Sequence, residues 1–433
     1  MQFSEEQIWA LAPDEASKKA GKDLAHPEKW ISKGANDVAI WGECKGSGSK
    51  PYETQIHVET ITFKCSCPSR KFPCKHSIGL LVLFVKNKSF FTDLHPPKWV
   101  TDWLNKKAEQ TTKKVEQKDK PVDEFAQAKR LQAREQLVEN GIDELLLWIK
   151  DVVKNGIVSM PENGTSILHH LAKRMVDAKS QGLASILKKM AVIDYYSEGW
   201  EEKFLSQLIH LYLTISGFKN KTHINELLLE DVRSNIGFTI AQEQLKTKQG
   251  ITDNWMVIGK QTIHDDDMVI EKNWLYGCST KQYALIIQFS IRWQINSLLL
   301  MPGSCVHATL VYYPSAWPLR AIIKEQFALV ETPKPIGFNN WNEVSSVINN
   351  NRAMMPLTIE IPFIIHQVLP VFYQNTWWLK DETHTMVRMP NNFTALYTLL
   401  AISGGQAIDV SVVGNGDIFQ PIGVWLHHQF FSL

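Results

Sequence analysis

Three cysteines and one histidine stand close together near the start of the sequence, and no other feature constrains the fold as strongly. They follow the spacing C-x-C-x6-C-x-H, with Cys65, Cys67, Cys74 and His76 at the four positions. Three thiolates and one imidazole can fill all four positions around a tetrahedral zinc ion, which is typical of a structural site. Buried or free cysteines and a redox pair are the alternatives, but a redox pair leaves His76 without a role. The motif therefore predicts a zinc-stabilised module with Zn2+ as its cofactor.

The segments around this motif predict how it is built. Residues 38–44 and 52–59 alternate between apolar and polar on either side of a Gly/Ser-rich tip, which is typical of a β-hairpin. A further strand over residues 61–65 is expected to hold the first two cysteines on one face, because alternate residues of a strand point the same way. Residues two apart on a helix diverge by about 200°. Cys74 is therefore expected in the loop or at the N-cap, and His76 in the first turn of the next helix.

Basic residues surround the motif, since the stretch from Lys64 to Lys88 contains six of them and no acidic residue. Such an excess attracts phosphate, and it predicts contacts with a nucleic acid or another partner through Arg70, Lys71 and Lys75. A zinc ion with three thiolates carries a net charge of about −1, however, and nearby basic side chains can offset that charge. A solvated lysine-rich face is the third interpretation, and the sequence leaves all three open.

The sequence shows neither a signal peptide nor a long apolar segment. Its first residues, MQFSEEQIW, are acidic and amphipathic. The longest apolar stretch, residues 78–85, is far shorter than the ~20 residues that span a bilayer. Thiolate ligands need a reducing compartment, so a soluble cytoplasmic protein without membrane contact is expected. Cys44 lies before the hairpin tip and is interpreted as a free thiol.

Composition and periodicity divide the 433 residues into domains. Residues 1–104 form the N-terminal zinc-finger domain, and residues 105–121, which are almost devoid of apolar side chains, form a linker. In residues 122–240 apolar side chains recur in helical stripes, one of which begins after Gly141, so a helical domain is expected. Residues 241–433 alternate between strand-like runs and turns with a few helices. The predicted fold class is α+β multidomain: a β-hairpin/helix zinc module, a central helical domain and a C-terminal mixed α+β domain.

The motif resembles the SWIM zinc finger, whose core is C-x-C, a variable spacer and C-x-H, and it matches at all four ligand positions. The hairpin expected before it and the helix expected after it also resemble that family's fold. Further segments are similar to bacterial SWIM zinc finger family proteins. These segments are Pro13–Ser17, Trp41–Cys44, Gly46–Gly48 and Phe419–Trp425.

This resemblance implies zinc binding by the four motif residues. SWIM modules occur in transposases, chromatin-type ATPases, ubiquitin-ligase-like proteins and recombination accessory factors, and they are proposed to bind DNA or other proteins. The bacterial members are expected near genes for MoxR-type AAA+ ATPases and von Willebrand A-domain proteins. The resemblance thus implies, as the alternative function, a scaffold or adaptor in such an assembly. The chain has no G-x-x-x-x-G-K-[ST] phosphate loop, so it is not itself the ATPase.

No constellation in the sequence predicts an active site or a small-molecule substrate. His264 is followed by three aspartates, but consecutive carboxylates point in different directions. Ser304 and Cys305 precede His307, but they lack the strand–elbow–helix setting and the third member of a catalytic triad. The prediction is therefore a non-enzymatic interaction protein, with an enzyme in the C-terminal domain as the remaining alternative.

Overall fold

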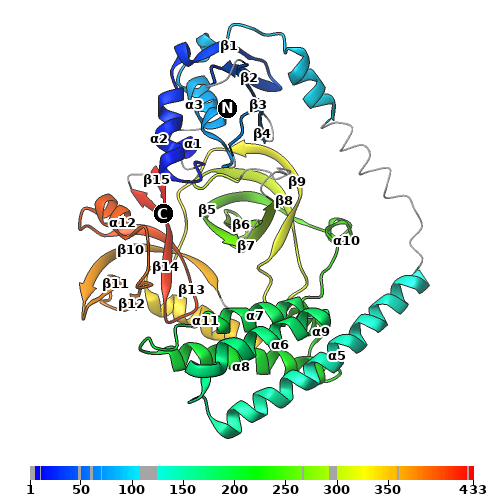
Figure 1. Cartoon of the computed structure of the whole chain (residues 1–433). Coiled ribbons are helices and arrows are strands. Elements are labelled where there is room, and N and C mark those ends of the chain that lie inside the picture. The colour runs from blue at the N-terminus through cyan, green and yellow to red at the C-terminus, as the bar shows by residue number, and fades with distance from the viewer. Residues whose placement is uncertain are drawn as a thin grey trace.

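The structure is a computed structural model of the chain. It describes residues 5–9, 11–46, 50–58, 62–69, 71–106, 124–265, 268–291, 300–357, 360–426 and 429–433. Arg70 and nearly all of the predicted linker lie outside these residues. Figure 1 shows the N-terminal elements at the top, a helical bundle at the bottom and two sheets between them.

The N-terminal part is a four-stranded antiparallel sheet with helices packed against it. Its strands, in spatial order, are β1 (Trp30–Ala35), β2 (Ala39–Cys44), β3 (Tyr52–His57) and β4 (Thr62–Cys65). The helices are α1 (Glu5–Trp9), α2 (Glu15–Leu24), α3 (Lys75–Lys86), the short 3-10 turns η1 (Pro27–Lys29) and η2 (Lys88–Phe90), and residues 98–106. Ile78 and Leu81 of α3 are fully buried in the core that the helices share with the sheet.

The hairpin expected from the sequence corresponds to β2 and β3, whereas β1 was not predicted. The central residues of β1, Ser32-Lys33-Gly34, interrupt any alternation of apolar and polar side chains. Gly34 is required by close packing, because a Cβ atom there would lie only 2.5 Å from the ring of Trp41 on β2. The strand is therefore specified by what it packs against rather than by its own pattern.

A helical bundle follows. Its elements are α5 (Glu124–Asn155), the π-helical turn η4 (Met160–Gly164), α6 (Thr165–Asp177), α7 (Gln181–Ala191), α8 (Trp200–Lys219), α9 (Glu226–Ile236) and the short α10 (Gln242–Lys246). Each of the longer helices contributes an apolar face, and Leu145, Leu187 and Leu211 are fully buried in the common core. Leu357, from the segment between α11 and β10, packs into the same core and so joins the bundle to the sheets.

The two apolar stripes predicted on either side of Gly141 belong to one continuous helix, α5. The glycine does not end the helix. A Cβ atom at this position would lie 2.5 Å from the Cβ atom of Ala178, at the C-cap of α6. Gly141 therefore allows α6 to approach α5 closely, which explains why a helix-weakening residue lies in the middle of a long helix.

The C-terminal part contains two antiparallel sheets. The first consists of β5 (Ile251–Asp265), β6 (Met268–Gly277), β7 (Tyr283–Ile291), β8 (Cys305–Tyr312) and β9 (Ala321–Val330), in the order β7-β6-β5-β8-β9. The second consists of β10 (Ile361–Tyr373), β11 (Thr376–Lys380), β12 (Met386–Arg388), β13 (Ile408–Gly414), β14 (Phe419–Leu426) and β15 (Gln429–Ser432), in the order β12-β11-β10-β13-β14-β15. If the strands of each sheet are numbered in chain order, both sheets have the spatial order 3-2-1-4-5, and the second sheet adds its sixth strand at the edge. The same topology therefore occurs twice.

The two sheets pack face to face through their central strands. Met256 and Ile258 of β5 and Ile364 of β10 lie in the core between the sheets. The neighbouring Phe363 points to the opposite face of its sheet, which α11 (Trp341–Met354) and α12 (Leu396–Ser403) cover. Mixed helices and antiparallel sheets with a helical bundle confirm the α+β class in its broad outline.

Candidate metal centre

The end of β4, the loop after it and the start of α3 bring the four motif residues together. Cys65 is the last residue of β4, Cys74 is the N-cap of α3, and His76 lies in the first turn of that helix. The strand predicted over residues 61–65 is confirmed as β4, and Cys67 lies just beyond its end. Ser66 still bonds to β3, but Pro68 lacks the N–H that a further ladder bond needs.

The ligand atoms of the four residues all lie within 4.8 Å of one another. Nδ1 of His76 is 3.9 Å from Sγ of Cys65 and 3.9 Å from Sγ of Cys74. A tetrahedral ion with Zn–S bonds of about 2.3 Å and a Zn–N bond of about 2.0 Å separates its ligand atoms by about 3.5–3.8 Å. The donor set therefore fits a metal ion that closes the cluster slightly, with the imidazole bound through Nδ1.

Polar and aromatic side chains hold these ligands from outside. The hydroxyl oxygen of Thr54 lies 3.2 Å from Sγ of Cys65, and that of Ser77 lies 3.4 Å from Sγ of Cys74. The ring of Tyr52 packs with its centre 5.0 Å from that of the imidazole. Such contacts orient metal ligands and stabilise thiolate charge. These contacts were not predicted from the sequence, although Thr54 lies opposite Cys65 in the β3–β4 register, which a correct alignment of the two strands would reveal.

Burial and mutual contacts shift the proton affinities of the cluster. Hydrogen bonding from Cys65 and then Cys67, opposed by burial, lowers the pKa of Cys74, and the N-terminus of α3 favours the same thiolate. Contacts with Cys67 and Cys74, together with burial, raise the pKa of Cys65. Burial lowers the pKa of His76, but its contacts with Cys67 and Cys74 prevail and raise that pKa to about 9. A metal ion must displace these protons, so metal binding weakens as the pH falls.

The three basic residues predicted as contacts have different surroundings. Nζ of Lys71 lies 2.6 Å from Oδ2 of Asp14, the N-cap of α2, whose Oδ1 accepts the N–H of Ser17 at 2.7 Å. The hydrogen bond from Lys71, followed by that from Ser17, lowers the pKa of Asp14 to about 2. Lys71 thus links the ligand loop to α2. Lys75 is exposed at the first position of α3, and Arg70 falls outside the described residues.

Cys44 lies at the end of β2, outside the group of four. It is completely buried, and burial raises the pKa of its thiol. No disulfide joins any of the six cysteines, all of which lie in the described part of the chain.

Ser304 and His307, which the sequence analysis considered for an active site, do not contact each other in the structure. Ser304 is buried and donates its hydroxyl proton to the carbonyl of Met301 at 2.7 Å. Nδ1 of His307 lies 2.8 Å from the amide oxygen of Asn254 rather than near the serine. The side chains from His264 to Asp267 fall outside the described side chains.

An Asp–His pair in the second sheet was not predicted, and it is structural. Nδ1 of His366 lies 3.1 Å from Asp409, while Nε2 accepts the N–H of Gly337 at 2.9 Å. Both ring nitrogens are therefore occupied, and the imidazole has none left to accept a proton from a substrate.

Comparison with known proteins identifies one domain of the chain. Residues 133–236, which run from within α5 to the end of α9, match a family model described as the SWIM-associated four-helix bundle domain. A search of curated proteins and a search of solved structures found no match. Among the described helices, none combines the length and the apolar character needed to cross a membrane.

The matched bundle and the Cys/His cluster lie in different parts of the chain, so they are independent observations. SWIM-associated bundles are defined by their occurrence with SWIM modules, and the cluster has the ligand types and spacing of such a module. The bundle match therefore supports a SWIM-family protein, as the motif from Cys65 to His76 predicted.

Proposed function

We propose that this protein is a zinc-binding, non-enzymatic interaction protein. The observation that carries the proposal is the donor set of Cys65, Cys67, Cys74 and His76. Thiolate and imidazole ligands favour zinc, and four protein ligands leave a tetrahedral ion without a position for a substrate. The metal would then stabilise the module rather than catalyse a reaction.

The charges around the metal centre favour a protein partner over DNA. Lys71, one of the predicted phosphate contacts, is already paired with Asp14. Among the described basic residues of the loop and the start of α3, Lys75 is left to contact a phosphate group. Affinity for DNA depends on several phosphate contacts together, because each one releases counterions.

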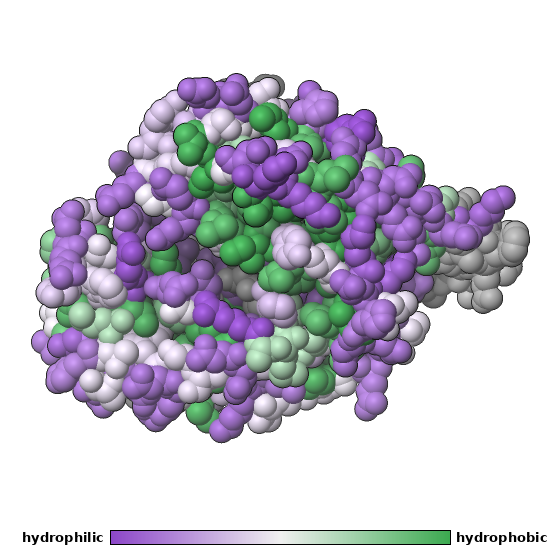
Figure 2. All heavy atoms as spheres, turned by 90° about the horizontal axis from the view of Figure 1, so that it is seen from below, coloured by the Kyte–Doolittle hydropathy of each residue, from purple (hydrophilic) through white to green (hydrophobic). Residues whose placement is uncertain are grey.

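The helical bundle has an exposed apolar surface that suits the binding of a protein partner. Leu205, Ile209, Tyr212 and Leu213 of α8 are between 38% and 52% exposed, and their spacing places them on one face of the helix. Figure 2 views the whole molecule from the side of the bundle and shows apolar residues gathered around the middle of the view, with hydrophilic residues around them. Contiguous exposed apolar surface of this kind marks protein interaction sites. We call these four residues the α8 stripe.

The resemblance to bacterial SWIM proteins supplies the class of partner. A scaffold or adaptor for a MoxR-type AAA+ ATPase and a von Willebrand A-domain protein would use the α8 stripe to bind one of them, with zinc maintaining the N-terminal module. The experiment is co-purification of the tagged full-length chain with these two proteins. We expect Leu205→Glu with Ile209→Glu to abolish the association and Val153→Glu, an exposed site on α5 outside the stripe, to leave it intact.

Failure of the wild-type chain to retain either protein would contradict the scaffold version. DNA binding is the second candidate, favoured by the exposure of Lys75 beside the metal centre. It is tested by fluorescence anisotropy of a labelled duplex at several salt concentrations. If the chain binds the duplex and Lys75→Glu lowers both the affinity and its salt dependence, DNA is the partner instead.

A further inference from the structure

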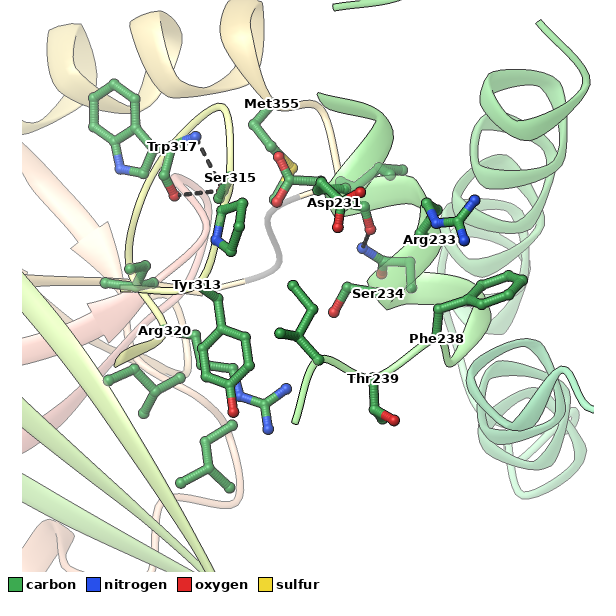
Figure 3. Close-up of a pocket in the computed structure, with 18 of the residues that line it drawn as sticks. Asp231, Arg233, Ser234, Phe238, Thr239, Tyr313, Ser315, Trp317, Arg320 and Met355 are labelled. Carbon is green, nitrogen blue, oxygen red and sulfur yellow. Dashed lines mark hydrogen bonds between the residues drawn. The ribbon is translucent and has the colours of Figure 1, made fainter. Parts of the chain in front are cut away.

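A cavity of about 580 Å3 lies where the helical bundle meets the sheets (Figure 3). One wall comes from α5, α7 and α9, and the other from β6, β7, the β8–β9 connection and the segment that leads into β10. The volume falls within the range of about 300–1,000 Å3 that is typical of small-molecule sites. None of the four metal-ligand candidates lines it, so it is separate from the metal centre.

Cationic side chains outnumber acidic ones in its walls. The cations are Arg134, Lys189, Arg233, Lys272 and Arg320, and the acids are Glu230, Asp231 and Glu360. This excess favours an anion in the cavity. Which of the cations is available depends on their existing partners.

Three of the cations already have acceptors within the protein. Lys272 pairs with Glu360 and Arg233 with Glu135, each at 2.6 Å. Arg134 donates to a backbone carbonyl at the C-cap of α9 at 2.8 Å. These side chains build the walls of the cavity. They do not need a ligand to balance their charge.

No carboxylate in the described part of the chain pairs with the two remaining cations, Lys189 and Arg320. Lys189 is exposed, whereas Arg320 is held in place. Its guanidinium group lies 4.5 Å from the ring centre of Tyr313 and is half-buried. Its backbone is fixed on both sides: the carbonyl of Arg320 accepts the N–H of Tyr313 at 2.9 Å, and the residue forms a bridge with Leu285 of β7. A stacked and positioned guanidinium without a partner is well suited to bind a carboxylate or phosphate in two-point contact.

The opposite wall completes a site for a small ligand. In Figure 3, Arg320 and Tyr313 face Ser234 across an open space. The hydroxyl group of Ser234 adds hydrogen-bonding capacity. Leu285, Ile287 and Leu319 also line the cavity and make part of its wall apolar. We propose that this cavity binds a small organic anion, with its carboxylate or phosphate on Arg320 and a ring or other apolar body against that wall.

The connection between β8 and β9 is positioned for this role. Ser315 accepts the N–H of Trp317 at 3.1 Å and donates to the carbonyl of the same residue at 2.9 Å, as the dashed lines in Figure 3 show. The N–H of Ala316 is held by Asp231 of α9 at 2.8 Å. The connection is thus tied both to itself and to the bundle. A ligand does not have to order it on binding, which lowers the entropic cost of association.

The test is isothermal titration of the full-length chain with phenyl phosphate, benzoate, adenosine 5′-monophosphate and inorganic phosphate. We expect at least one of the organic anions to bind with a stoichiometry of one and to bind more tightly than inorganic phosphate. Arg320→Ala should weaken that binding at least tenfold, and Arg320→Lys should weaken it less, because it keeps the charge but loses the planar two-point contact. Lys334→Ala, which removes the same charge at an exposed site outside the cavity, should leave the affinity unchanged.

A second variant keeps the test informative if the Arg320 variants do not fold. Ser234→Phe is expected to fill the space from the exposed end of α9 and abolish binding while Arg320 remains in place. Wild-type chain that binds none of the four anions would overturn the proposal, as would equal affinity of the wild-type and Arg320→Ala chains. Binding of inorganic phosphate as tight as that of the organic anions would also overturn it, since the apolar wall would then contribute nothing.

Discussion

At the scale of single residues, the metal centre depends on side chains whose contacts are weak without a metal ion. Three thiol groups and an imidazole converge there, with their ligand atoms within 4.8 Å of one another. Their mutual hydrogen bonds are 3.9 Å long where His76 is involved. A bound metal ion would replace these contacts with coordinate bonds and so contribute directly to the stability of the module.

Replacing one ligand should therefore remove both the metal and the local fold. We expect Cys74→Ser to lose stoichiometric zinc and to unfold the β1–β4 module, because zinc binding contributes about 10–16 kcal/mol in zinc-finger peptides. Zinc content after dialysis, measured by atomic emission, and amide hydrogen exchange of residues 11–46 are the measurements.

Cys44→Ser is the matched control. Cys44 is buried nearby but lies outside the group of four. This variant should retain zinc and lose only about 1 kcal/mol of stability, as an ordinary core substitution does. Zinc lost equally from both variants, or retained by Cys74→Ser, would show that the four residues are not the ligand set.

Residue spacing predicted the members of the cluster but not its surroundings. The short distances between Cys65 and Cys67 and between Cys74 and His76 limit where these residues can lie, so proximity follows from the sequence. No spacing in the sequence indicates that Thr54 and Ser77 contact the ligands. Their hydroxyl groups reach Cys65 and Cys74 only because of the register of the strands and the orientation of the helix. No spacing indicates the position of Arg320 either, since the residues across the cavity from it belong to the helical bundle, far away in the sequence.

At the scale of elements, α5 shows how a glycine can be misinterpreted from sequence. Periodicity predicted the helical stripes around Gly141, and glycine weakens a helix by about 1 kcal/mol relative to alanine. The sequence could not show that α6 approaches so closely that any side chain at this position meets Ala178.

Gly141→Ala should therefore destabilise the bundle although alanine favours helix. A Cβ atom at 2.5 Å forces α5 and α6 apart, and overpacking of this kind costs about 1–3 kcal/mol. Chemical denaturation followed by circular dichroism measures the loss. The double variant Gly141→Ala with Ala178→Gly removes the clash and should recover most of the stability. If it is no more stable than Gly141→Ala alone, the close approach of the two helices is not the cause.

Other elements were missed for a related reason. β10 contains Pro362 and Pro370, which lack the N–H of a ladder donor and interrupt a strand pattern. In the structure these prolines lie opposite Val413 and Leu379, on strands that flank β10 on both sides. Pairing with two neighbours overrides the local signal, and only tertiary structure reveals it.

At the scale of the whole molecule, a buried carboxylate joins the bundle to the sheets. Asp231 of α9 is 7% exposed and accepts the N–H of Ala316, between β8 and β9, at 2.8 Å. Burial raises the pKa of Asp231, while hydrogen bonds from Ser315 and Ala316 oppose that shift. The amide of Ala316 would be left without this acceptor if the carboxylate were removed.

Asp231→Ala should therefore weaken the junction by about 1 kcal/mol, the low end of the cost of leaving a donor unsatisfied, because Ala316 is only partly buried. We expect the thermal unfolding of the bundle and of the sheets, recorded by calorimetry, to separate into two transitions. Asp231→Asn keeps an acceptor oxygen and avoids a buried charge, so it should behave like the wild type. A single unchanged transition for Asp231→Ala would show that other contacts, such as Leu357 in the bundle core, are sufficient.

The contacts between the two sheets also affect how the chain folds. The hydroxyl group of Ser411 on β13 bonds to the carbonyl of Ile258 on β5 at 2.5 Å, although the two residues are 153 positions apart. Ile422 on β14 fills the space beside Gly259. Contacts between such distant residues form slowly, because a long loop must close first. On the ribosome, the helices of the bundle can assemble from neighbouring segments while β5 waits for β13 and β14 to be synthesised. The apolar face of β5 stays exposed to solvent until then. The nascent sheets, rather than the zinc module or the bundle, are therefore the part of this protein that needs protection by a chaperone.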